Sequence, residues 1–138
     1  MSNEISVHDN FVLSYTVKCQ ERQITFHTVY IDREPYEHTN IVFTGVLASH
    51  FEHDNFKTIL FDVEEETLEQ VYTAYREVFE HNKRYGWPNI DYNTEAELIA
   101  TLKAQNIKGF LISSSSGMDG LVLAQEMQIV PAPRSGAV

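Results

Sequence analysis

Length and composition place this chain among packed globular proteins. Its 138 residues are the length of one domain, with 43% hydrophobic and 12% aromatic residues. These values argue against a disordered chain, and the longest apolar runs are too short to cross a bilayer. The net charge of −10 disfavours nucleic acid and anionic membranes as partners and favours a cationic partner.

The acidic charge is concentrated in the first half of the chain. Residues 1–66 carry twelve acids and four bases, a net charge of −8, whereas residues 67–138 carry a net charge of −2. The N-terminus has no basic region followed by an apolar core, so it lacks the pattern of a secretion signal. The one cysteine, Cys19, allows no internal disulfide. We therefore expect a cytoplasmic protein.

The first half predicts four strands in two hairpins. Apolar residues alternate along residues 11–19 and again along residues 24–30, on either side of a short polar connection, which is typical of a hairpin with one solvated face. Cys19 lies on the apolar register and is expected to be buried. Residues 32–40 contain Pro35 and many charged or amide side chains, and they predict a loop.

The second predicted pair of strands follows this loop. Residues 41–51 form one strand, in which Gly45 marks a bulge or a close approach of another backbone. Residues 58–63 form the next strand, and their alternation places Phe61 and Val63 on the inward face.

Two helices are predicted after these strands, because the hydrophobic period changes from two residues to three and four. Glu64, Glu65 and Glu66 stand at the start of the first helix, where their charge complements the helix dipole, and Gly86 ends it. The second begins at Thr94, which opens a capping box. The apolar stripe of the first helix consists of Leu68, Val71, Tyr72, Tyr75, Val78 and Phe79.

Two further strands, residues 109–113 and 121–130, complete the order ββββααββ. We therefore predict an α+β fold, in which an antiparallel sheet of about six strands carries two helices packed on one face. Residues 1–130 are expected to form a single domain. Residues 131–138 are rich in Pro, Gly and Ser and predict a flexible C-terminal tail.

The segment ASHFEHDNF, residues 48–56, brings together side chains that can bind a metal. His50 and His53 would be neighbours on a helix, but on a strand they point to opposite faces, and His50 shares its face with Glu52. The flanking alternation favours a strand, so we interpret the segment as a polar strand end and expect no metal and no cofactor. A metal site of His50, Glu52 and His53 is the weaker alternative.

The predicted partner-binding surface combines two acidic runs with exposed aromatic side chains. Acid–base catalysis by paired carboxylates needs one buried acid with a raised pKa, and both acidic runs stand among other charges, so we expect no enzyme. Tyr36, Trp87 or Phe56 would supply buried anchors in a complex, although Trp87 also fits a hydrophobic plug after the first helix. The surface consists of Glu34, Tyr36, Glu37, Asp62, Glu64, Glu65, Glu66 and Trp87.

Four segments carry a resemblance to known proteins: HDNFVLSYTV, IVFTGVLASHFEHDN, TILFDVEEE and NIKGFLISSSSGMDGLVLAQEM. They resemble a group of small, acidic bacterial proteins of uncharacterised function that are similar to the immunity proteins of polymorphic toxin systems. The resemblance covers residues 8–127 and includes no catalytic motif. It implies a cytoplasmic protein that blocks a cognate toxin by binding at or near a basic active site.

The sequence thus favours a binding protein, an immunity-type inhibitor that docks an acidic surface on a basic toxin or enzyme. One alternative is a small-molecule-binding protein or enzyme that uses a face around His27, His50 and Glu52. Another is a housekeeping protein-interaction domain with no inhibitory role. Exposed edge strands leave a dimer possible.

Overall fold

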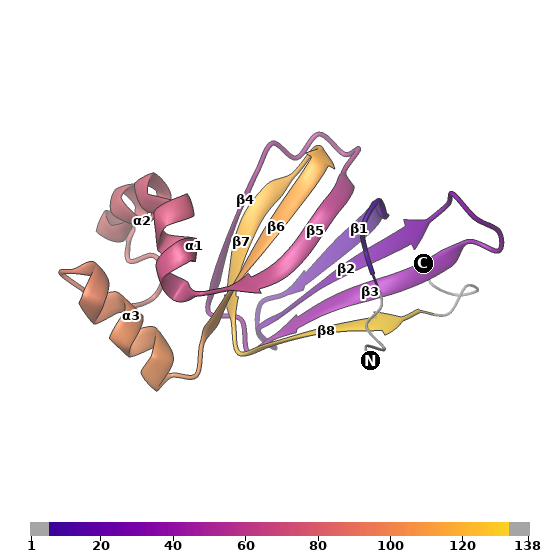
Figure 1. Ribbon diagram of the computed structural model, residues 1–138. Coiled ribbons are helices and arrows are strands. Elements are labelled where there is room, and N and C mark those ends of the chain that lie inside the picture. The colour runs from indigo at the N-terminus through magenta and orange to yellow at the C-terminus, as the bar shows by residue number, and fades with distance from the viewer. Residues whose placement is uncertain (1–5, 133–138) are drawn as a thin grey trace.

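The computed structural model describes residues 6–132 (Figure 1). Strands are the commonest regular element in this range, and the helices all fall between the fifth and the sixth strand. In chain order the elements are β1 (Phe11–Lys18), β2 (Gln23–Tyr30), β3 (Glu37–Thr44), β4 (Ala48–Glu52), β5 (Ile59–Glu66), α1 (Leu68–Ala74), α2 (Arg76–Asn82), the 3-10 helix η1 (Lys83–Tyr85), α3 (Glu95–Ala104), β6 (Lys108–Ser116), β7 (Asp119–Ala124) and β8 (Glu126–Pro131).

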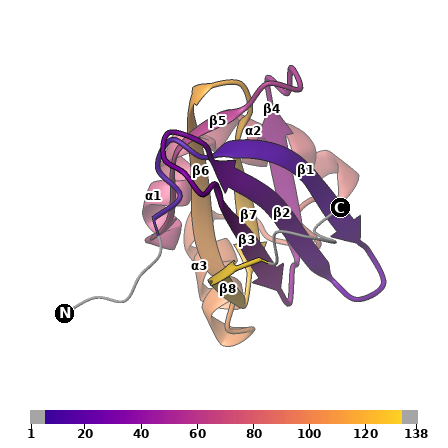
Figure 2. The same ribbon diagram turned by 90° about the vertical axis from the view of Figure 1, so that its right-hand side faces the viewer.

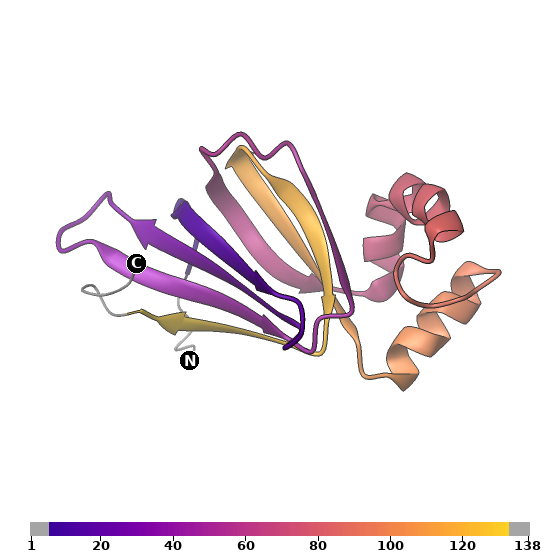
Figure 3. The ribbon, with the colours of Figure 1, turned by 180° about the vertical axis from the view of Figure 1, so that it is seen from behind.

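The strands form one antiparallel sheet in the order β4-β7-β6-β5-β1-β2-β3-β8. The sheet is folded at the β5–β1 junction, where the two strands share a single register pair, Phe11 with Ile59. Asn10 ties this junction together, because its carbonyl accepts from the Leu60 amide at 2.9 Å and its side chain donates to Thr28 at 3.0 Å. The two four-stranded halves therefore face each other, as Figures 1 and 3 show from opposite sides.

The chain crosses between the two halves where β3 leads to β4 and where β7 leads to β8. Gly45 makes the first crossing with a left-handed backbone, φ +62°, which favours glycine. The Gln125 amide at the second crossing donates to the carbonyls of Thr44 and Gly45 at 3.1 and 3.2 Å. A Cβ at position 45 would lie 2.5 Å from the Gln125 side chain, so the two crossings pack directly on each other.

The first core lies between the two halves of the sheet. Phe26 and Phe43 enter it from β2 and β3, and Phe110 enters it from β6 in the opposite half. The rings of Phe43 and Phe110 are 5.5 Å apart at their centroids and nearly perpendicular, a favourable aromatic arrangement that joins the halves.

The second core lies between the outer face of β6 and β7 and the helices. Figures 1 and 3 show the helices gathered on this one side of the sheet. Leu121 and Leu123 of β7 are fully buried against α1 and α3, whereas Val122 between them points into the first core. The strand β7 is therefore apolar on both faces because both are covered.

The predicted α+β class with an antiparallel sheet and helices on one face is confirmed, but the details differ. The hairpin β1–β2 forms as predicted. Among residues 6–132 the sheet has eight strands, not six, because each of the two long apolar runs is divided where the chain changes halves, at Gly45 and at Gln125. The predicted second hairpin is absent from this range, since β4 pairs with β7 and β5 with β6.

Three local predictions in and around the strands were wrong. The loop expected over residues 32–40 ends earlier, because β3 already begins at Glu37. Irregular pairing between β5 and β6 shifts the alternation, so Leu60 is buried and Phe61, predicted inward, is exposed. Cys19, expected to be buried, is exposed in the turn after β1.

The helical region also differs from the prediction. Glu64, Glu65 and Glu66 close β5 and do not start a helix. The first predicted helix is divided at Tyr75, whose φ of −125° and ψ of 33° are not helical. It begins after Thr67, which accepts from the Gln70 amide in a capping box. The helix after Thr94 forms as predicted, and its buried residues are Leu98, Ile99 and Leu102.

The predicted flexible tail lies mostly outside the described residues. Pro131 is the last residue of β8, and the Ala132 amide donates to the His38 carbonyl at 3.0 Å. Residues 133–138 are not described, and the prediction for them stays untested.

Candidate partner-binding surfaces

Asp62, Glu64 and Glu66 form a row on the outer face of β5, which we call the carboxylate ladder. They share this face because side chains alternate along a strand, and the residue between Asp62 and Glu64, Val63, is buried in the first core. None of the three forms an ion pair with a cation within residues 6–132.

The carboxylates of the ladder repel one another. The pKa of Glu64 is raised above its ordinary value, chiefly by the negative charge of Asp62 and also by a hydrogen bond to Asp62, by slight desolvation and by Glu66. Glu64 is exposed to solvent, so the ladder is open to a partner. The fold therefore holds three like charges together without a compensating cation among the described side chains.

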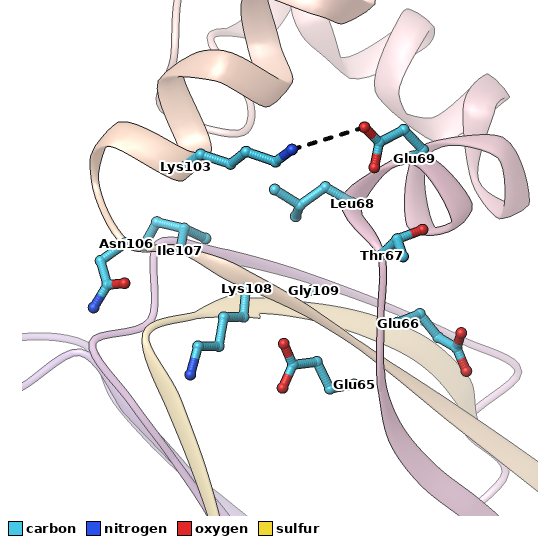
Figure 4. Close-up of a pocket in the computed structure, with 10 residues that line it drawn as sticks. All are labelled: Glu65, Glu66, Thr67, Leu68, Glu69, Lys103, Asn106, Ile107, Lys108 and Gly109. Atoms are coloured by element: carbon cyan, nitrogen blue, oxygen red, sulfur yellow. Dashed lines mark ion pairs between the residues drawn. The ribbon is translucent and has the colours of Figure 1, made fainter.

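The end of the ladder borders a pocket of about 330 Å³ between the start of α1 and the end of α3 (Figure 4). Lys103 and Glu69 face each other across it, with Nζ and Oε2 3.9 Å apart. Figure 4 shows Glu65 and Glu66 pointing to opposite sides of the strand end, Glu65 on the side of Lys108. Glu65 therefore belongs to a surface of mixed charge, separate from the ladder.

The second acidic run lies at the turn between β2 and β3, which Figure 1 places at the end of the molecule away from the helices. Tyr36 is exposed there. Glu37 pairs with Arg33 at 2.8 Å, so part of the negative charge of this turn, which also contains Glu34, is neutralised. This turn is therefore a weaker cation-attracting surface than the carboxylate ladder.

Trp87 lies in the helical layer. Its ring packs against the buried Phe79 at 5.0 Å, and its amide donates to the Asn82 carbonyl at 3.3 Å. It thus fills the position of a hydrophobic plug after the helix, the alternative that the sequence also allowed. The predicted surface residues consequently occupy three separate places: the β2–β3 turn, the outer face of β5 and the helical layer.

The histidines of the ASHFEHDNF segment do not converge. His50 Nε2 lies 3.0 Å from Glu52 Oε2, as expected for two residues on one strand face, whereas His53 approaches Asp119 at 3.9 Å. No three His, Cys, Asp or Glu side chains gather to hold a metal among residues 6–132. His27 lies in the other half of the sheet, where it contacts Asn40 at 3.1 Å, so it does not share a face with His50 and Glu52.

The side chain of Tyr75 lies beside His50, with ring centroids 6.0 Å apart. Burial, and then the negative charges of Glu52 and Asp119, raise the pKa of Tyr75 to about 12. A pocket of about 420 Å³ lined by Glu52 and by residues 73–78 lies next to this group. The phenol is therefore neutral at physiological pH and can act only as a hydrogen-bonding group.

A further candidate surface lies along β1, whose apolar side chains were predicted to be buried. Leu13 and Val17 are 58% and 51% exposed, and Phe56 of the β4–β5 loop is 91% exposed. Tyr15 donates a hydrogen bond of 2.7 Å to Asp54 in that loop, and this bond is the main cause of its raised pKa. All of these side chains except Val17 line a pocket of about 290 Å³, whose residues are Val12, Leu13, Ser14, Tyr15, Asp54, Phe56, Thr58 and Met118.

This surface was missed because alternation does not say whether an apolar strand face is covered. The same alternation of Phe11, Leu13, Tyr15 and Val17 describes a buried face and an exposed one. It also gives no sign of the register shift between Val12 and Ser14, which brings Val12 against the first core and breaks the alternation within β1. Phe56, a lone aromatic among polar residues, is the one sequence signal of this surface, and by itself it predicts only an anchor for a partner.

Comparisons with known proteins found no match. No family model, curated protein or solved structure is similar to this chain. Among the described helices, all are too short or too polar to cross a membrane. The resemblance to immunity proteins therefore stays a prediction.

Proposed function

We propose that this protein is an immunity-type inhibitor that binds a basic protein, either a toxin or an enzyme, in the cytoplasm. The observation that carries the proposal is the carboxylate ladder of Asp62, Glu64 and Glu66, in which Glu64 is exposed and Asp62 and Glu66 are half-buried. None of the three pairs with a cation within the described range. The net charge of −10 and the resemblance to immunity proteins support it.

A basic partner would relieve the repulsion within the ladder. The raised pKa of Glu64 means that its ionised form is disfavoured in the free protein. Lysine or arginine side chains placed against the ladder would favour that ionised form, so part of the binding free energy would come from removing an unfavourable interaction. The same charges would steer the encounter, an effect that raises association rates by about ten- to a thousandfold.

The test is capture of a partner by tagged protein from a lysate of the source organism, with three forms compared. The first is the wild type. The second carries Asp62→Asn, Glu64→Gln and Glu66→Gln, which keep the shape of the ladder and remove its charge. The third is a control that neutralises three exposed acids without ion pairs, by Glu77→Gln, Asp91→Asn and Glu126→Gln. Both variants change the net charge from −10 to −7.

We expect the wild type and the control to retain one basic protein at low salt, and the ladder variant to lose it. The captured protein should lose its activity when the wild type is added. Retention by all three forms would remove the ladder from the proposal. Retention without loss of activity would favour a housekeeping interaction domain.

A second candidate function rests on the group formed by His50, Glu52 and Tyr75. An imidazole–carboxylate contact of 3.0 Å beside a half-buried phenol, next to a pocket, offers polar groups that could bind a small molecule. Screening a metabolite collection by thermal shift tests it. Stabilisation of the wild type that is lost in His50→Gln, and kept in the exposed His53→Gln control, would favour a ligand site or an enzyme over a protein inhibitor.

A further inference from the structure

The surface around Phe56 includes a strand edge with no neighbour. The Val12 amide donates to the Thr58 carbonyl at 3.0 Å, and this is where β1 leaves the opposite half of the sheet. Beyond this point, within residues 6–132, β1 pairs only with β2. Figure 2 shows β1 along the margin of its half of the sheet. Residues 13–18 therefore present unpaired backbone groups to solvent on one side.

The side chains on this edge are unusual for an exposed strand. Natural edge strands are commonly protected by charged residues or proline, yet Leu13, Tyr15 and Val17 are apolar and solvent-exposed. Only Lys18, at the end of β1, carries charge. Phe56 extends the apolar surface from the adjacent loop. Exposed apolar side chains beside a free strand edge are typical of sites that bind an extended peptide as an additional strand.

The loop that carries Phe56 is held in place against β1. Both carboxylate oxygens of Asp54 are used, since Oδ2 accepts from the Tyr15 hydroxyl at 2.7 Å and Oδ1 accepts from the Phe56 amide at 3.1 Å. Phe56 itself has a left-handed backbone, φ +65°, which is uncommon for a large side chain. The exposed ring is thus presented by a fixed loop, and it would lose little conformational freedom on binding.

Charge indicates which occupant fits this edge. Asp54 is the one carboxylate among the pocket residues, and no lysine or arginine lines the pocket. A segment that combines apolar side chains with lysine or arginine would fill the pocket and complement Asp54. A second copy of the chain is disfavoured, because two molecules that each carry a charge of −10 repel one another.

We propose that the free edge of β1 binds an extended segment of the basic partner as an added strand, with an apolar side chain of that segment packed against Phe56. This inference rests on the proposed function and specifies how the partner is held. The carboxylate ladder attracts the partner, and the β1 edge supplies the apolar and main-chain contacts that retain it.

The test uses a displayed library of random twelve-residue peptides as the probe. The wild type is compared with Val17→Lys, which places a charge on the edge, and with Phe56→Ala. The controls are Val130→Lys on β8, the opposite edge strand of the same half, and Tyr85→Ala, another exposed aromatic. All four substituted side chains are exposed, so the variants should fold, and their thermal unfolding confirms it.

We expect the wild type to enrich peptides with alternating apolar residues and interspersed lysine or arginine. The most enriched peptide, made synthetically, should bind at least about tenfold more weakly to the Val17→Lys and Phe56→Ala variants than to the controls. On binding, amide hydrogen exchange should slow in residues 13–18.

Three outcomes would overturn the inference. One is that the wild type enriches no peptides beyond those that a protein carrying both Val17→Lys and Phe56→Ala also enriches. Another is protection of a different edge, such as β8 or β4. The third is a wild type that is already dimeric with residues 13–18 protected, which would make a second copy the occupant. If the ladder variant still loses its captured partner in any of these cases, the proposed function stands and only this docking mode fails.

Discussion

Replacement of Gly109 by alanine tests how the helical layer is seated on the sheet beside the carboxylate ladder. Gly109 pairs with Glu66 in the sheet and faces α1. A Cβ at this position would lie 2.6 Å from Val71 Cγ2 and 3.4 Å from Leu68 Cδ2. Val71 is buried and β-branched, so it cannot turn away, and either α1 or β6 must shift. Overpacking of this kind costs about 1–3 kcal/mol.

A double-mutant cycle separates this contact from a general loss of stability. Val71→Ala alone removes two methyl groups and should cost about 2 kcal/mol, including the cavity. In the double variant the new methyl at position 109 fills part of the space left by Val71. Its cost should therefore fall below the sum of the single costs by about 1 kcal/mol or more.

Urea unfolding followed by circular dichroism measures the four free energies. Single costs that add to within about 0.5 kcal/mol would refute the reasoning, because they would show that Gly109 and Val71 do not contact each other. A Gly109→Ala variant as stable as the wild type would have the same meaning.

Three further predictions concern single side chains. Glu64→Gln should raise the free energy of unfolding at neutral pH, because the raised pKa of Glu64 in the folded protein means that its ionised form is unfavourable there. This gain in stability over the wild type should shrink as the pH falls through the folded-state pKa of Glu64 and vanish below the ordinary value of 4.5. Urea titrations at several pH values measure it. Tyr75 stays neutral to about pH 12 in the folded protein but ionises near pH 10 when unfolded. The wild type should therefore lose stability between these pH values relative to Tyr75→Phe. If the free energies of unfolding of the two proteins change equally over this pH range, the phenol of Tyr75 is not buried. Thr67→Ala should cost about 1 kcal/mol through loss of the cap to Gln70, whereas the exposed Thr73→Ala in the same helix should cost nothing.

Features set by neighbouring residues were predictable from the sequence. The hairpin of β1 and β2 follows from alternation on either side of a polar turn, and the start of α3 follows from Thr94, whose side chain accepts from the Glu97 amide at 3.2 Å. The class of the fold follows from the change of period between residues 63 and 68. Each of these depends on contacts within a few residues.

Features set by distant contacts were not predictable. A continuous apolar run such as residues 41–51 gives no sign that the chain changes halves at Gly45, since each part is covered by a different core. The break at Tyr75 is hidden because three- and four-residue spacings continue through it. The pairing of β5 with β6 and of β4 with β7 joins residues that lie 43 to 75 positions apart along the chain, from Glu66 with Gly109 to Ala48 with Leu123.

The same distinction applies to the candidate surfaces. The acids of residues 62–66 were recognised from the sequence, but their alternation on a strand separates Glu65 from the ladder, which a helix start would not do. The exposed edge of β1 depends on where β5 ends its pairing with β1, and that is a tertiary contact.

The most direct test of the account is the salt dependence of the association rate between this protein and the captured basic partner. The wild type, the ladder variant and the matched control variant are measured by stopped flow at several ionic strengths. We predict a rate that falls steeply with salt for the wild type and the control, and a slower rate with a shallower dependence for the variant without ladder charges. Equal rates and equal salt dependence for the ladder and control variants would contradict the account, because three neutralised acids at any place on the surface would then have the same effect.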